Sequence, residues 1–118
     1  MKLSIIIPIY NEELNIAVLY ERLKKVCLQI TDEHEMIFVN DGSRDHSILL
    51  IHELAGKDPA VKYINFSRNF GHQVAVTAGL DHASGDAVVI IDADLQDPPE
   101  LISEMYQKMQ EGFEVVYA

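Results

Sequence analysis

The chain has 118 residues, of which 24% are charged and 48% hydrophobic, as in an ordinary soluble globular protein of one domain. Nine Lys and Arg against 19 Asp and Glu give a formal net charge of −10, which argues against nucleic acid or an anionic membrane surface as the main partner. A single cysteine, Cys27, excludes an internal disulfide and a cysteine-based zinc site, and its place on the apolar side of a helical pattern favours a buried thiol.

Apolar runs and helical patterns alternate along the chain. Five mostly apolar runs are expected to be strands: residues 2–9, 35–40, 61–66, 86–91 and 113–118. Four segments between them carry apolar residues at helical spacing: residues 16–30, 48–54, 71–84 and 98–109. This alternation predicts an α/β domain, a Rossmann-like and mostly parallel sheet with helices on both faces.

Residues that commonly begin or end helices predict the helix boundaries. Asn11 is expected to cap the first helix, and Gly56 to close the second. Gly85 is expected to end the third helix. Asp97 is expected to cap the fourth, with Pro98 at its first position.

No part of the sequence has the features of a signal peptide or a membrane-spanning helix. The apolar run after Lys2 is too short for a signal peptide and contains Pro8. No apolar run approaches the roughly 20 residues that span a bilayer, so we expect this segment to be soluble. The last predicted strand ends with the chain at Ala118, which suggests a fold truncated at its C-terminus; pairing of two copies through such an edge makes a homodimer possible.

Polar residues gather where the predicted strands end. In open parallel sheets, ligands bind beyond the carboxyl ends of the strands. The four segments at that edge are rich in hydrogen-bonding and metal-binding groups: residues 8–12, 40–45, 67–72 and 92–97. The turns at the opposite edge, residues 30–35 and 57–60, are expected to be ordinary solvated turns.

The segment Asp92-Ala93-Asp94 places two carboxylates one residue apart after an apolar strand. Adjacent carboxylates repel each other, so a divalent cation that carries a phosphorylated ligand would explain the pair. Mg²⁺ and Mn²⁺ prefer such oxygen ligands and commonly complete their shell with phosphates. Turn and cap chemistry is the alternative interpretation. Gln96 either adds a neutral oxygen to the site or is an exposed loop residue.

Other polar residues at this edge allow two interpretations each. Asp41 either accepts hydrogen bonds from a base or a ribose or braces its own loop, and Tyr10 either stacks on a base or is simply half-buried. Arg68 either neutralises a phosphate or forms a surface ion pair, and His72 either contacts a ligand or is structural. Since the chain lacks a glycine-rich phosphate loop, metal and side chains must hold any phosphate.

Four motifs in order resemble those of family 2 glycosyltransferases with the GT-A fold: "IIIPIYNEELNI", "FVNDGSRDHS", "FSRNFGHQVAVTAGLDHASGD" and "IDADLQDPPELI". The likeness covers essentially the whole chain and is strongest to the polyprenyl-phosphate branch, which includes dolichol-phosphate mannose synthases and bacterial bactoprenol glucosyltransferases. The resemblance implies that residues 1–118 are the nucleotide-sugar-binding part of a GT-A domain.

The resemblance also implies roles for individual residues. The nucleotide-binding positions fall on Pro8, Tyr10, Glu12, Val39, Asp41, Arg68, Asp92 and Ala93. The positions that bind Mg²⁺ or Mn²⁺ fall on Asp92, Asp94 and Gln96. One departure is Asn40, where some relatives carry a second aspartate beside the base-contacting one.

The implied reaction transfers a sugar from a UDP- or GDP-sugar to a polyprenyl phosphate by one inverting displacement. The metal would neutralise charge on the leaving diphosphate. Family members continue past Ala118 with an acceptor-binding half, the proposed catalytic base and usually membrane-spanning helices. No base is therefore named here, and the full-length protein is expected at the cytoplasmic side of a membrane.

Four alternatives remain open. A related family 2 enzyme would use a saccharide acceptor, and a fragment of this kind can also be a non-catalytic nucleotide-binding piece or have no retained binding. A phosphate-responsive receiver-like domain would carry its acidic cluster after strands one and three, whereas here the acidic pair follows strand four.

Overall fold

The computed structural model of this chain describes residues 2–96, 98–110 and 115–117. Strands and helices alternate as the sequence predicts. Their bounds are β1 (Leu3–Ile9), α1 (Ile16–Ile30), β2 (His34–Asn40), α2 (Ser47–Lys57), β3 (Val61–Asn65), α3 (His72–His82), β4 (Ala87–Ile90), a 3₁₀ turn (Pro99–Leu101), α4 (Ile102–Gln110) and β5 (Val115–Tyr117).

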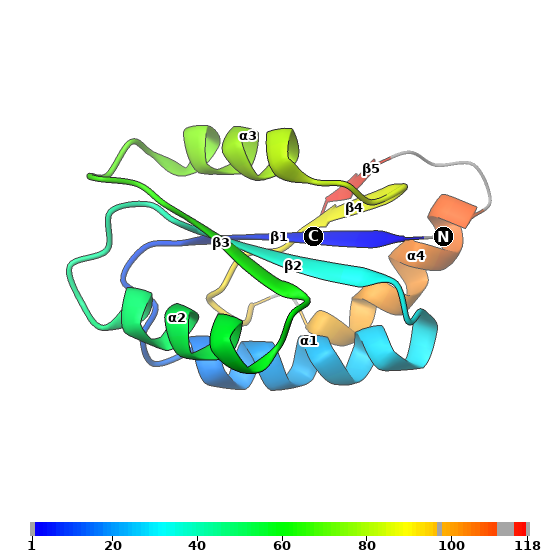
Figure 1. The fold of residues 1–118 in the computed structure, drawn as a ribbon. Coiled ribbons are helices and arrows are strands. Elements are labelled where there is room, and N and C mark those ends of the chain that lie inside the picture. Colours follow the sequence, from blue (N-terminus) through cyan, green and yellow to red (C-terminus); the bar gives the residue numbers. More distant parts are fainter. Residues whose placement is uncertain (1, 97, 111–114, 118) are drawn as a thin grey trace.

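The five strands form one parallel sheet in the order β3-β2-β1-β4-β5. Helices α1, α2 and α4 lie on one face of the sheet and α3 lies on the other (Figure 1). The predicted α/β class, with a parallel sheet covered on both faces, is therefore confirmed. β1 is the central strand, and each parallel connection crosses from one strand end to the other over a helix.

The core follows from the two-residue period of the central strand. Alternate residues Leu3, Ile5, Ile7 and Ile9 pack toward α1 and α4, whereas Ile6 packs toward α3. All of these side chains are buried, as a strand covered on both faces requires. Cys27 lies in the α1 side of the core as predicted, and burial raises the pKa of its thiol to about 12.

The predicted start of the first helix is wrong. Asn11 does not cap α1, which begins at Ile16 after Asn15. Asn11 instead has a left-handed backbone, with φ of 53°, and its side-chain oxygen accepts a hydrogen bond of 2.8 Å from the Arg44 amide. The side chain is therefore used to tie the loop after β1 to the loop after β2.

Two other predicted helix boundaries also differ. α2 continues through Gly56 to Lys57, since nothing there requires a left-handed residue. Pro98 has an extended backbone, with ψ of 128°, and the helical turn begins at Pro99 instead. The predicted cap Asp97 lies outside the described residues.

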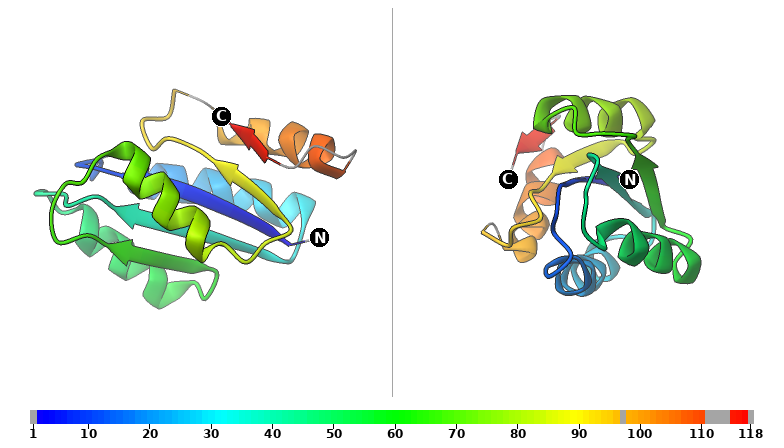
Figure 2. Two further views of the ribbon diagram at one scale, coloured as in Figure 1. Left: turned by 90° about the horizontal axis from the view of Figure 1, so that it is seen from above. Right: turned by 90° about the vertical axis from the view of Figure 1, so that its left-hand side faces the viewer.

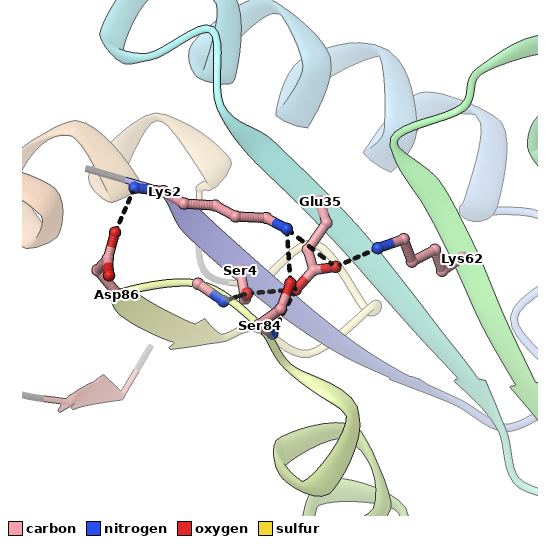
Figure 3. Close-up of polar contacts among 7 residues, drawn as sticks. Lys2, Ser4, Glu35, Lys62, Ser84 and Asp86 are labelled. Carbon is pink, nitrogen blue, oxygen red and sulfur yellow. Dashed lines mark hydrogen bonds and ion pairs between the residues drawn. The ribbon is translucent and has the colours of Figure 1, made fainter.

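The amino ends of the strands hold a buried ionic network that the sequence did not indicate (Figure 3). The Glu35 carboxylate, almost fully buried, accepts hydrogen bonds from the Ser4 hydroxyl at 2.6 Å, the Lys62 ammonium at 2.7 Å and the Ser84 amide at 2.7 Å. Burial alone would raise the pKa of Glu35, but the bonds from Lys62, Ser4 and Ser84 lower it to about 2. Because Ser84 is held here in the segment before β4, α3 ends at His82 and not at Gly85.

The second turn at this edge is also not an ordinary solvated turn. The buried Asp58 carboxylate accepts hydrogen bonds from the Tyr20 hydroxyl at 2.7 Å and the Ala60 amide, and pairs with the Lys24 ammonium at 2.8 Å. Burial would raise the pKa of Asp58, but these partners lower it to about 2. The expectation of solvated turns at residues 30–35 and 57–60 is therefore wrong for Glu35 and Asp58, which are buried, although Asp32 and Glu33 are exposed as expected.

Replacing Glu35 tests the network. Glu35→Gln removes the charge that pairs with Lys62, so we expect a loss of about 2–3 kcal/mol in the free energy of unfolding, measured by urea denaturation. The control is Glu53→Gln, which breaks the exposed pair with Lys57 on α2 and should change stability by less than about 0.5 kcal/mol. Equal losses for the two variants would contradict a special role of Glu35.

The network also predicts a pH dependence. The pKa of Glu35 falls from 4.5 to about 2 on folding, so its contribution is present above pH 4.5 and is lost as the pH falls toward 2. The difference in unfolding free energy between the parent chain and Glu35→Gln should be constant above about pH 5 and shrink between pH 4.5 and 2. If the difference did not change with pH over this range, the contacts would not be lowering the pKa of Glu35 in the folded chain.

Candidate functional site

A cavity of about 520 Å³ opens at the carboxyl edge of the sheet, within the usual range for sites of small ligands. Figure 2 (left) shows the segments that follow β1, β2 and β4 gathered at the end of the sheet opposite the N-terminus. Seven of the predicted site residues line this cavity: Pro8, Tyr10, Glu12, Asp41, Asp92, Ala93 and Asp94. Residues from three strand ends, far apart in the sequence, are therefore brought together.

Asp92 and Asp94 face the cavity from the end of β4. Asp94 accepts a hydrogen bond of 3.2 Å from the Gln96 amide, which is the turn chemistry expected as the alternative, and Leu95 between them has a left-handed φ of 64°. Within the described ranges, no lysine or arginine pairs with either carboxylate. The Nε2 atom of His72 lies 3.8 Å from the Asp92 Oδ1 atom. Their negative charge is therefore not compensated by a lysine or an arginine of that part of the chain.

These carboxylates fit a hard divalent cation. Among residues 2–96, 98–110 and 115–117, no group of three or more His, Cys, Asp and Glu side chains is arranged to hold a metal. Asp92 and Asp94 would thus supply two oxygen ligands and leave the rest of the shell open. Mg²⁺ is typically bound in this way, by one or two carboxylates together with water and phosphate oxygens.

Asp41 fixes the loop that forms the opposite wall of the cavity. Its buried carboxylate accepts hydrogen bonds from the Phe70 amide at 2.7 Å, the Gly71 amide at 3.1 Å and the Asn69 side chain at 3.1 Å. The bracing role considered for Asp41 is thus present, but toward residues 69–71 and not within its own loop. A contact between Asp41 and a base stays a prediction.

Gly42 is required by the same docking. Its φ is +68°, and a Cβ atom on it would clash with the backbone of Arg68 and Asn69. The chain after β2 can therefore approach the loop before α3 only with glycine at this position.

The loop that carries Tyr10 and Glu12 is held by the loop after β2 and by the first residue of α2. The Asn11 amide donates to the Ser43 hydroxyl and the Glu12 amide to the Ser47 hydroxyl, each at 3.0 Å. Tyr10 remains 45% exposed beside the cavity, so its ring is accessible for stacking on a ligand.

Three predicted site residues do not line the cavity. Val39 is buried in the core under α3, and Gln96 is exposed in the turn after Asp94. The guanidinium of Arg68 lies 4.1 Å from the centre of the Phe70 ring, where it stacks in place of the surface ion pair considered for it. A role for these residues toward a nucleotide stays a prediction.

Three cavity residues come from the loop before α3: Asn69, Gly71 and His72. Sequence reasoning marked residues 67–72 as polar but did not single out Asn69 or Gly71. The sequence signal that could have pointed to this loop is the glycine before the helical pattern. In the structure Gly71 has a φ of +107° at the start of α3, a conformation that favours glycine.

A parallel sheet of order β3-β2-β1-β4-β5 with a ligand-sized cavity at its carboxyl edge is the arrangement of nucleotide-binding α/β proteins. The family model described as glycosyl transferase family 2 matches residues 4–118. The chain therefore belongs to this glycosyltransferase family. None of the described helices is long and apolar enough to cross a membrane.

Two curated relatives illustrate the match. The chain is 61% identical over 115 residues to the uncharacterized glycosyltransferase YkcC of Bacillus subtilis, covering 98% of this chain and 36% of the relative. It is 47% identical over 118 residues to the bactoprenol glucosyl transferase of Shigella phage SfV, covering 100% of this chain and 38% of the relative. The chain thus spans somewhat more than a third of the length of these relatives.

Two solved structures show the same fold. S. aureus TarS 1–349 in complex with UDP-GlcNAc has a TM-score of 0.74 and 27% identity, over 94% of this chain and 32% of that one. The mannosyltransferase PcManGT of Pyrobaculum calidifontis, in complex with GDP-Man and Mn²⁺, has a TM-score of 0.63 and 26% identity, over 82% of this chain and 33% of that one. Both likenesses support the predicted GT-A fold.

The contact between Gly42 and the loop before α3 can be tested with a matched pair of variants. Gly42→Ala should lower the free energy of unfolding by at least about 1 kcal/mol, because it adds a clash at a left-handed position. Gly56→Ala, inside α2 with open space around it, should raise stability by about 0.5–1 kcal/mol. If the midpoint of thermal unfolding shifted in the same direction for both variants, this packing would be contradicted.

Proposed function

We propose that this chain is the donor-binding part of a glycosyltransferase that moves a sugar from a nucleotide-sugar to a polyprenyl phosphate by the single inverting displacement expected for the family. Residues 1–118 would hold the donor, and the remaining part of the protein would supply the acceptor site and any base. The name of the Shigella phage relative supports a polyprenyl acceptor.

The observation that carries the proposal is the charge of the cavity. Glu12, Asp41, Asp92 and Asp94 line it, and no lysine or arginine is among its described lining residues. A diphosphate would be repelled from such a surface unless a cation lay between them. The acidic lining therefore favours a donor that enters together with a divalent metal.

Asp92 and Asp94 would hold Mg²⁺ or Mn²⁺, and a metal bound there supplies Lewis-acid stabilisation of charge on the leaving diphosphate. The structure of PcManGT with Mn²⁺ and GDP-Man supports a metal of this kind. Tyr10 and Pro8 lie on the same cavity and would contact the nucleoside, with Asp41 holding the wall formed by residues 69–71. The base remains open, because the similar solved structures carry UDP-GlcNAc in one case and GDP-Man in the other.

A polyprenyl acceptor would place the full-length protein at the cytoplasmic side of a membrane, although the described residues contain no membrane-spanning helix. Association of two copies through the edge of the sheet where β5 lies stays a prediction.

Calorimetric titration with UDP-glucose and GDP-mannose tests the proposal. We expect the chain to bind one of the two in the presence of Mn²⁺ and to lose at least tenfold in affinity when Mn²⁺ is removed. Asp94→Ala should weaken metal-dependent binding at least tenfold, since it removes one of two protein ligands. Asp81→Ala, which removes an exposed carboxylate of α3 that does not line the cavity, should bind like the parent chain.

Binding that does not depend on Mn²⁺, or equal binding by Asp94→Ala and the parent chain, would contradict the proposed metal site. Unfolding midpoints of both variants close to that of the parent chain would show that the comparison reports on the site and not on folding.

A further inference from the structure

His72 lies beside Asp92 in the lining of the cavity, but on a different element of the fold. It is the first residue of α3 and lines the cavity, with its side chain 52% exposed. The 3.8 Å between its Nε2 atom and the Asp92 carboxylate is longer than a hydrogen bond. No hydrogen bond from another described residue engages the ring. The imidazole is therefore available to a ligand in the cavity.

The position of His72 is fixed by the residues just before it. The Asp41 carboxylate holds the amides of Phe70 and Gly71, and Gly71 makes the left-handed turn from which α3 starts. A buried aspartate at the end of β2 therefore sets where the imidazole stands. The backbone position of His72 is therefore defined.

The surroundings of the imidazole indicate what it would bind. Among the described residues, His72, Asp92 and Asp94 are not arranged as a three-ligand metal site, which favours contact of the ring with a bound ligand over contact with the metal. An anion held by a cation on Asp92 and Asp94 would lie on the side of the cavity that His72 faces. Arg68 is stacked on Phe70 and does not line the cavity, which leaves His72 as the basic side chain among the described lining residues.

We propose that the Nε2–H group of His72 donates a hydrogen bond to the diphosphate of the nucleotide donor, next to the metal. This rests on the proposed function and adds to it a contact between α3 and the leaving group. His72 would then distinguish nucleoside diphosphates from monophosphates, because the nucleoside is bound elsewhere in the cavity by Tyr10 and Pro8.

The test compares three variants of the 118-residue chain by calorimetry with UDP, UMP, GDP and GMP in the presence of Mn²⁺. His72→Leu keeps side-chain volume without a donor and should weaken diphosphate binding about tenfold, or about 1.4 kcal/mol, with less than a twofold change for the monophosphate. His72→Gln, whose amide can donate at similar reach, should recover most of the loss. His82→Leu, at the exposed far end of the same helix, should bind like the parent chain.

Titration with Mn²⁺ alone separates the two ways in which His72 can matter. We expect the same Mn²⁺ affinity for His72→Leu and the parent chain; a matching loss of Mn²⁺ affinity would overturn the proposal, because His72 would then act through the metal. Metal-dependent diphosphate binding by the parent chain together with equal binding by His72→Leu would overturn the His72 contact alone. Failure of the parent chain to bind UDP or GDP with Mn²⁺ would overturn the proposed function as well.

Discussion

The parallel pairing of β1 with β4 at the centre of the sheet is the constraint on which the site depends. The chain runs outward from β1 through β2 to β3, with α1 and α2 on one face, and then returns over the other face through α3 to β4. The segments that leave β1 and β4 therefore go to different places, and a space remains between them. Three segments line that space: the acidic pair after β4, the loop after β1 and the start of α3.

The two edges of the sheet use carboxylates in opposite ways. At the amino edge, Glu35 and Asp58 are buried and each is paired with a lysine, so the charges are internally neutralised and their pKa values are low. At the carboxyl edge, Asp92 and Asp94 stay accessible and have no lysine or arginine partner among the described residues. The first arrangement stabilises the fold, while the second leaves a charge that a bound cation would compensate.

Asp41 connects these two roles. It is a buried carboxylate at the carboxyl edge, and the amides of Phe70 and Gly71 satisfy it in place of a cation. Its hydrogen bonds hold the wall of the cavity and the first turn of α3, so a residue expected at the nucleotide also shapes the place where the nucleotide would lie. Gly42 next to it permits the close approach that these bonds require.

Much of this could be predicted from the sequence because it depends on local patterns. Apolar periodicity located all five strands and four helices, and the rule for parallel sheets placed Pro8, Asp41 and Asp94 at one edge. The predicted helix boundaries were wrong where a residue distant in the sequence binds the side chain that was expected to act locally. Asn11 is a good capping residue, but the backbone of Arg44 takes its side chain.

The sequence pattern also could not predict which partners the side chains contact. Ser84 belongs to a plausible helix end, but Glu35 in another strand holds it and shortens α3. Arg68 carries the right charge for a phosphate but stacks on Phe70. The position of His72 in the cavity, 3.8 Å from Asp92, is visible only in the structure. These contacts depend on packing between segments that no single stretch of sequence describes.

Paramagnetic broadening by Mn²⁺ tests the central claim most directly, because the effect falls steeply with distance from the bound ion. In amide NMR spectra of this chain with substoichiometric Mn²⁺ and UDP or GDP, the signals of Asp92, Ala93 and Asp94 should broaden first, followed by those of Gly71 and Tyr10. The amides of Glu35 and Ser84 at the other edge of the sheet should remain sharp. Broadening centred on that amino edge, or spread evenly over the acidic surface, would contradict a metal site at the end of β4.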